Sequence, residues 1–259
     1  MVILYFLIGF ISSVIGAMAG LGGGTIIKPV LDFAGHYDLE TIGILSASTV
    51  MAMSTMSLVL MKTTEEKVDF KVSLLIAAGS IIGGLIGKGV FNFYVVNLES
   101  ADMIGIIQSG LLALLLIIIY VYFKLDRFVT SYKITNKVII FSTGLLLGLL
   151  SAFLGIGGGP LNVAILALLF SMTGREAVIN STFIIFFSQF ASLVLVTFTT
   201  SFQGIDLTML PYMIIGGIAG GCAGNILLFR LSSKAIRSIF SLTILVIVLV
   251  NIYNLVKGV

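Results

Sequence analysis

Two short glycine clusters are the parts of this 259-residue sequence whose composition and spacing could do chemistry. Gly22-Gly23-Gly24 and Gly157-Gly158-Gly159 each interrupt a long apolar run, and they lie 135 positions apart. Consecutive glycines do not easily continue a helix, and they allow positive φ and close approach of a ligand to the backbone. We therefore expect each cluster to begin a new helix, whose first N–H groups lack intrahelical partners and carry a partial positive charge. Such helix ends bind anions without a cationic side chain.

Small hydroxyl and amide side chains near each cluster are further candidates for ligand contact. Thr25 is expected at an N-cap-like position of the first short helix, and Pro160 suits the first turn of the second. Neutral donors can hold an oxyanion and release it again; the alternative is that they bond helix carbonyls or join helices. The candidate substrate-binding residues are Gly22, Gly23, Gly24, Thr25, Lys28, Ser46, Ser48, Thr49, Gly157, Gly158, Gly159, Asn162, Asn180, Ser181, Thr182 and Gln189.

Lys28 is the basic residue that the sequence places inside an apolar segment, and a charge at such a position is a functional candidate by default. It could add positive charge to an anion site. It could equally pair with Asp32 one helical turn on, or extend to the membrane surface. The second half has Val163 at the equivalent position, so the expected site is asymmetric.

The sequence suggests neither catalytic residues nor a set of metal ligands. It holds a single histidine, His36, and a single cysteine, Cys222, so no Cys–His pair is indicated. It has no GxxxxGK[ST] phosphate loop for ATP. His36 lies beside Asp38 and Glu40, but no further ligands can be identified. We expect no enzyme activity, no cofactor and no metal.

The composition indicates which kind of elements must position the clusters. Hydrophobic residues make up 59% of the chain and charged residues only 10%, with a mean hydropathy of +1.22. A soluble domain carries about 25% charged residues. Long apolar runs approach the ~20 residues that cross a hydrocarbon core. We therefore predict an all-α polytopic membrane protein, and the net charge of +3 is attributed to cytoplasmic-face lysines rather than to a nucleic-acid surface.

The clusters belong to a longer internal repeat. The offset of 135 also pairs Ser46 with Ser181, and further on an offset of 137 pairs two glycine ridges of the small-xxx-small type, which favour close helix packing. The ridges are Gly79-x3-Gly83-x3-Gly87 and Gly216-x3-Gly220-x3-Gly224. We assign residues 1–259 to a single membrane transport domain with halves 1–124 and 138–259 and a cytoplasmic linker at 125–137.

The distribution of Lys and Arg predicts how the halves are related. If every apolar segment crossed the membrane, Arg230, Lys234 and Arg237 would face outside, against the positive-inside tendency. If each glycine-broken pair of segments is a re-entrant helical hairpin, eleven of the 14 Lys and Arg become cytoplasmic, and only Lys88 and Lys257 lie clearly outside. We therefore predict two inverted repeats, each a hairpin plus three transmembrane helices, with both termini outside.

Three motifs connect the sequence to a known family. They are Gly16-Ala17-x-Ala19-Gly20-x-Gly22-Gly23-Gly24 with Pro29 and Leu31, then Gly155-Ile156-Gly157-Gly158-Gly159-Pro160, and Arg175-Glu176-Ala177 before Ser181-Thr182. Together they resemble the sulfite exporter TauE/SafE family of membrane permeases over essentially the whole chain. One departure is Ala164, which stands where the first half has Pro29 and suggests that the second short helix starts differently.

The resemblance implies export or uptake of small sulfur-containing anions, such as sulfite or organosulfonates, in a prokaryotic cell membrane. The leading interpretation is a secondary transporter working by alternating access, with its substrate at the paired glycine-rich helix N-termini. Coupling to H⁺, to Na⁺ or to no ion stays open. The expected partners are a small anion and the lipid bilayer, and a homo-oligomer is compatible with the sequence. The alternatives are a cation or metal transporter and a non-catalytic membrane subunit that binds a partner protein.

Overall fold

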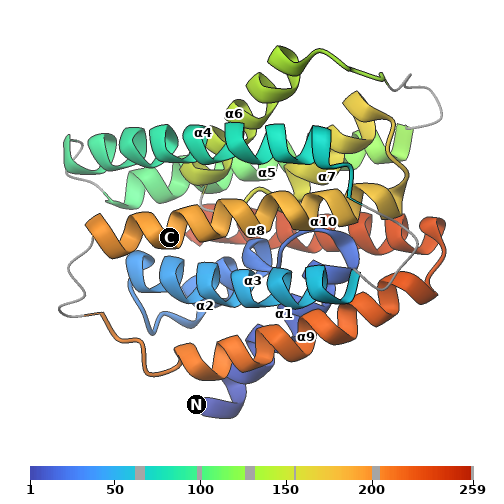
Figure 1. Ribbon diagram of the computed structural model, residues 1–259. Coiled ribbons are helices and arrows are strands. Elements are labelled where there is room, and N and C mark those ends of the chain that lie inside the picture. The colour runs from blue at the N-terminus through green and yellow to red at the C-terminus, as the bar shows by residue number, and fades with distance from the viewer. Residues whose placement is uncertain (62–67, 98–100, 126–131, 155, 200–204, 258–259) are drawn as a thin grey trace.

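The computed structural model describes residues 1–61, 68–97, 101–125, 132–154, 156–199 and 205–257, and these residues form ten α-helices without a strand (Figure 1). The first half contributes α1 (Val2–Ala19), α2 (Gly24–Ala34), α3 (Leu39–Met61), α4 (Phe70–Asn97) and α5 (Ala101–Leu125). The second contributes α6 (Lys137–Leu154), α7 (Gly159–Phe170), α8 (Gly174–Thr199), α9 (Leu210–Arg230) and α10 (Ser233–Lys257). The predicted all-α fold is confirmed.

The surface of the bundle is that of a membrane protein. Among the described residues, eight helices are long and apolar enough to cross a bilayer, and α2 and α7 are the short ones. Large apolar side chains stand exposed on the outer helices, such as Ile118 at 55% on α5 and Leu242 at 63% on α10. Such side chains are stable facing lipid and would be a liability in water. Length alone allows α1 and α6 to cross as well, so the six-crossing arrangement stays a prediction.

Each glycine-broken helix pair begins and ends at the same end of the bundle. Near the start of α1, the Tyr5 hydroxyl lies 2.8 Å from Nδ1 of His36, which follows α2. Before α6, the backbone N–H groups of Tyr132 and Ile134 donate to the carbonyls of Leu168 and Leu169 near the end of α7, at 2.8 and 3.1 Å. These are the contacts that a hairpin makes when its second arm returns to where the first arm started.

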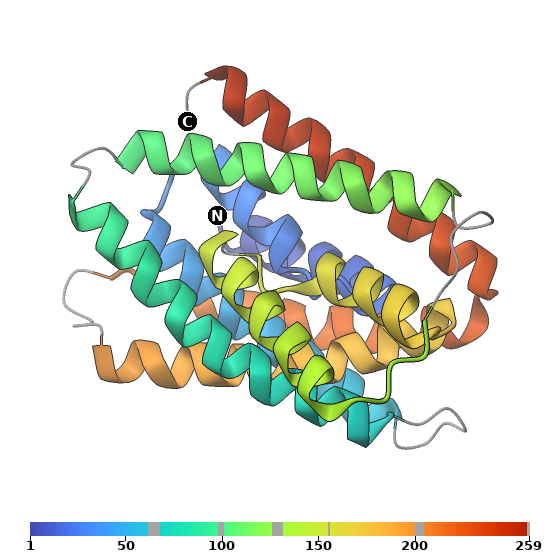
Figure 2. The same cartoon turned by 90° about the horizontal axis from the view of Figure 1, so that it is seen from above.

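The two hairpins are anchored at opposite ends of the bundle. We call these the Tyr5 end and the Arg237 end. The start of α9 packs with Tyr5 through Leu210, whereas Arg237 at the start of α10 lies with its guanidinium 6.0 Å from the ring of Phe123 at the end of α5. Figure 2 shows α5 and α10 side by side along much of their length. The start of α8 joins the Arg237 end, where Arg175 Nη2 donates to Leu231 O at 2.8 Å.

Two glycine-lined interfaces join the halves. A β-carbon on Gly83 of α4 would overlap the carbonyl oxygen of Leu145 on α6, and one on Gly220 of α9 would overlap that of Phe10 on α1. The small residues therefore let the helix backbones touch, which the sequence predicted for both ridges. The structure adds that each ridge packs against the long arm of the other half's hairpin: α4 lies along α6, and α9 lies along α1.

Candidate substrate site at the paired glycine turns

The first glycine turn reverses the chain between α1 and α2. Gly20, Gly22 and Gly23 have φ values of 70°, 77° and 68°, in the left-handed region that side-chain-bearing residues avoid. The N–H of Gly20 caps α1 by bonding to the carbonyl of Gly16, and Gly23 is the N-cap of α2. The predicted N-cap position of Thr25 is wrong, because the left-handed backbone at Gly23 starts the helix earlier and places Thr25 within the first turn.

The second turn repeats this geometry between α6 and α7. Gly157 and Gly158 have φ values of 67° and 83°, Gly158 is the N-cap, and Pro160 occupies the first turn as expected. Both short helices begin at equivalent residues, Gly24 and Gly159. Ala164 stands at the position equivalent to Pro29, yet α7 starts at the residue equivalent to the start of α2. The expectation that the second short helix starts differently is therefore wrong. Gly155 lies outside the described residues.

The two turns lie in direct contact. A β-carbon on Gly159 would overlap the carbonyl oxygen of Leu21, and one on Gly24 would lie 3.6 Å from the carbonyl oxygen of Ile156. The N-termini of α2 and α7 therefore meet, although they are far apart in sequence. Their partial positive charges act at the same place within the bundle.

Several of the predicted polar residues surround these turns. The Ser46 hydroxyl would lie 3.3 Å from a β-carbon on Gly24, and Gln189 Nε2 would lie 2.6 Å from one on Gly157. Asn162 faces Gly158, with Nδ2 and Oδ1 at 3.2 and 3.3 Å from the equivalent point. Ser181 belongs to the second half but donates to the carbonyl of Gly20 at 2.8 Å, which ties α8 to the first turn.

Other predicted residues use their hydrogen-bonding capacity elsewhere. Thr49 and Thr182 donate to the carbonyls of Leu45 and Val178 in their own helices. The side-chain oxygen of Asn180 accepts from the backbone N–H of Asp69 and from Ser73 Oγ, at 2.8 and 2.6 Å, and so joins the start of α8 to that of α4. For these three residues, the helix-joining alternative describes the contacts that the structure contains.

Lys28, Ser48 and Thr25 are the remaining candidates. Lys28 is half-buried on α2, one turn beyond Gly24, and its electrostatic partner is Asp32. Ser48 is half-buried on α3. Thr25 is fully buried in the first turn of α2, and its hydroxyl makes no hydrogen bond to the described residues.

Sequence reasoning missed two serines on the long arms of the hairpins. The hydroxyls of Ser13 on α1 and Ser151 on α6 are buried, and neither has a hydrogen-bond partner within the described residues. Ser13 has its Cα 3.7 Å from a β-carbon placed on Gly23, and Ser151 Oγ would lie 2.9 Å from one on Gly158. The signal was available, since each serine stands in an apolar run six to nine residues before a glycine cluster.

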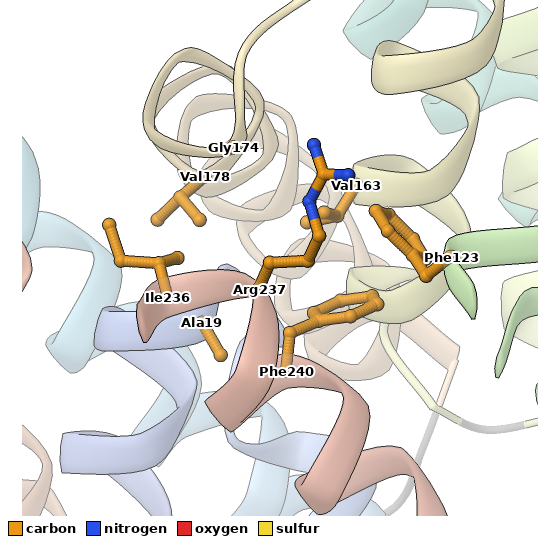
Figure 3. A pocket seen from close by; sticks show the side chains of 8 residues that line it. All are labelled: Ala19, Phe123, Val163, Gly174, Val178, Ile236, Arg237 and Phe240. Carbon is orange, nitrogen blue, oxygen red and sulfur yellow. The ribbon is translucent and has the colours of Figure 1, made fainter. Parts of the chain in front are cut away.

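A small hollow opens toward the first turn from the Arg237 end (Figure 3). Ala19, Val163 and Val178 line it together with Phe123, Phe240 and Arg237. Val163 and Val178 also flank Gly20, whose β-carbon would lie 2.8 Å from Cγ2 of Val163. Apart from Arg237 the lining side chains are apolar, so the neutral hydroxyl and amide donors lie at the turns rather than in this hollow.

The fold and the turns together define a polytopic membrane protein whose broken helices expose neutral donors within the bundle. This is the class of arrangement in which secondary transporters bind their substrates.

The chain belongs to the sulfite exporter TauE/SafE family, whose model matches residues 5–251. It is also similar to a Bacillus subtilis (strain 168) protein described as "Probable membrane transporter protein YunE", with 28% identity over a 204-residue alignment that covers 70% of this chain and 73% of the relative. No solved structure gives a significant match. The chain is therefore a multi-pass protein of the cell membrane from a family of membrane transporters.

Proposed function

We propose that this protein is a secondary transporter of small anions, with sulfite or an organosulfonate as the substrate. The observation that carries the proposal is the meeting of two helix N-termini at the glycine turns, where the buried hydroxyls of Thr25 and Ser151 have no hydrogen-bond partner among the described residues. The family and the relative support a permease, and the description of the family as sulfite exporters supports a sulfur oxyanion.

The chemistry of the turns suits an anion that must also be released. Helix N-termini stabilise negative charge, and hydroxyl and amide groups donate hydrogen bonds without forming an ion pair. Lys28 is the charged residue of α2 that lies nearest to the first turn, and the negative charge of Asp32, one helical turn further on, partly offsets its positive charge. The neutral donors would therefore hold the substrate less tightly than a buried arginine would.

We further propose that the halves are inverted repeats that work by alternating access. The hairpins close at opposite ends of the bundle, through Tyr5 and His36 in one case and through Tyr132 and Leu168 in the other. The long arm of each hairpin lies on a glycine ridge of the other half, so the halves meet there through closely approaching backbones. Movement of one half against the other would then expose the turns to each side of the membrane in alternation.

A ligand-induced thermal shift of the purified protein tests the proposed function. Sulfite, thiosulfate, sulfoacetate, taurine, sulfate and acetate would be compared at matched ionic strength, with divalent cations as a separate arm. We expect one or two sulfur oxyanions to raise Tm, because a ligand at 100 times its Kd stabilises the folded state by about 2.7 kcal/mol.

Two glycine variants supply the matched control for this measurement. Gly158→Val puts a side chain into the turn at φ 83° and should abolish the shift. Gly35→Ala also places a side chain on a left-handed backbone, at φ 66°, but its β-carbon meets nothing within 4 Å. This variant should therefore keep the anion-induced rise in Tm. A shift with divalent cations alone, or with no anion at all, would contradict an anion transporter.

A further inference from the structure

The two glycine turns are equivalent in sequence but not in surroundings. At the offset of 135, Ser151 corresponds to Gly16, Asn162 to Ile27, and Gln189 to Ser54. Gly16 and Ile27 have no side-chain donor, and the Ser54 hydroxyl donates to the carbonyl of Met51 in its own helix. Each polar group that faces the second turn is therefore matched at the first by a residue that donates nothing to it.

The backbone N–H groups differ in the same direction. In the first turn, Gly24 bonds to Gly22 O at 2.7 Å, and Ile26 and Ile27 both bond to Gly23 O at 2.9 Å. In the second turn, the N–H of Asn162 bonds to Gly158 O at 2.9 Å, whereas those of Gly159 and Leu161 make no bond to the described residues. The second turn thus offers more unpaired backbone donors.

We infer that the second turn is where the anion binds, with Ser151, Asn162 and Gln189 as the side chains that recognise it, and that the first turn is its packing counterpart. This assignment rests on the proposed function. Asn162 and Gln189 are 3% and 8% exposed, no hydrogen bond of their side-chain amides is found among the described residues, and the Ser151 hydroxyl beside them is enclosed and has no partner there. A buried amide without a partner is costly, so these groups are kept for a ligand that pairs them.

The donor set defines the class of ligand. One hydroxyl and two amide groups approach the turn from α6, α7 and α8, and the N–H groups at the start of α7 complete the set. Donors on several sides match an anion with several oxygens, such as a sulfite or sulfonate group, better than a carboxylate with two. The atoms nearest to the β-carbon positions of Gly157 and Gly158 belong to Ser151, Asn162 and Gln189, none of which is acidic.

The test is calorimetric titration of sodium sulfite into the full-length protein in detergent, against sodium chloride at the same ionic strength. Ser151→Ala and Asn162→Ile each remove donors at the second turn, and the latter installs the residue that the first half carries. We expect each to weaken sulfite binding by at least about tenfold, because each removes hydrogen bonds to a charged ligand.

Ser13→Ala is the matched control, because the Ser13 hydroxyl is also buried and without a hydrogen-bond partner among the described residues, on the helix that leads into the first turn. It should change the sulfite Kd by less than about twofold, within the scatter expected of a residue without ligand contact. Asn162→Asp covers the case in which Asn162→Ile does not fold. It keeps the shape of the side chain but adds a charge that repels the anion, so it should also lose binding.

The outcomes separate this assignment from the proposed function. Loss of binding in Ser13→Ala with full binding in Ser151→Ala and Asn162→Asp would place the anion at the first turn and overturn the assignment alone. Equal losses on both sides would assign the anion to both turns and overturn it as well. If the unaltered protein binds neither sulfite nor any other anion of the panel, the proposed function fails together with the assignment.

Discussion

At the scale of single residues, the site depends on positions where a side chain is excluded. Gly158 adopts a φ of 83°, and a β-carbon there would press on Ser151 Oγ at 2.9 Å. Any other residue would pay about 1–2 kcal/mol for the left-handed backbone and would fill the space between Ser151 and Asn162. Glycine at this position therefore shapes the turn and leaves its donors accessible at the same time.

Lys28 and Asp32 give a prediction at the residue scale. Lys28→Met should remove the opposite charge that acts on the Asp32 carboxylate in an apolar segment and destabilise the protein by about 1–3 kcal/mol, less than for a fully buried ion pair because Lys28 is only partly buried. The double variant Lys28→Met/Asp32→Asn should recover at least half of the lost Tm. The single variant Asp32→Asn completes the comparison. If the double variant loses as much Tm as Lys28→Met and Asp32→Asn lose together, the two residues do not act as a pair.

At the scale of helices, the glycine ridges decide which elements can touch. Gly83 faces the backbone of Leu145 on α6, whereas its neighbour Gly84 has the Gly148 carbonyl 3.9 Å from its β-carbon position. The first glycine is required by a helix–helix contact, and the second has room for a methyl group. The ridge therefore has a packing side and a tolerant side on the same helix.

Alanine at these two neighbours is the element-scale prediction. Gly83→Ala should lower the free energy of unfolding by about 1–3 kcal/mol, because its methyl group forces α4 away from α6. Gly84→Ala should be neutral or slightly stabilising, because alanine favours a helix over glycine by about 1 kcal/mol. Thermal unfolding of both variants in the same detergent makes the comparison. A loss of equal size in both would mean that propensity, not packing, accounts for the glycines.

At the scale of the whole molecule, the prediction concerns the side of the membrane that each end faces. In a Cys222→Ser background, Asp206→Cys before α9 should react with an impermeant maleimide from outside the cell. Lys234→Cys at the start of α10 should react only after the membrane is opened. Both positions are exposed, so their reactivity reports sidedness rather than burial. The reverse pattern at either position would rule out the inverted repeats that we propose.

The sequence by itself determined the features that short stretches of chain encode. Long apolar runs predicted the spanning helices, and the three consecutive glycines predicted both helix breaks, because apolarity and backbone freedom are properties of neighbouring residues. The repeat offset also predicted that the two breaks would correspond. The N-cap of α2 was missed by two residues because Gly23, whose positive φ is not specified by its residue type, takes the cap position from Thr25.

Only the tertiary structure decided which of these features meet. It put Ser181 on the carbonyl of Gly20, 161 residues away in the chain, and turned Asn180 toward Asp69 and Ser73 instead. It also brought Ser151 and Gln189 to the second glycine turn, whereas the hydroxyls of Ser46 and Thr25 lie at the first. Neighbouring polar residues on one helix point in different directions, and their partners depend on how the helices of both halves pack, which local sequence does not specify.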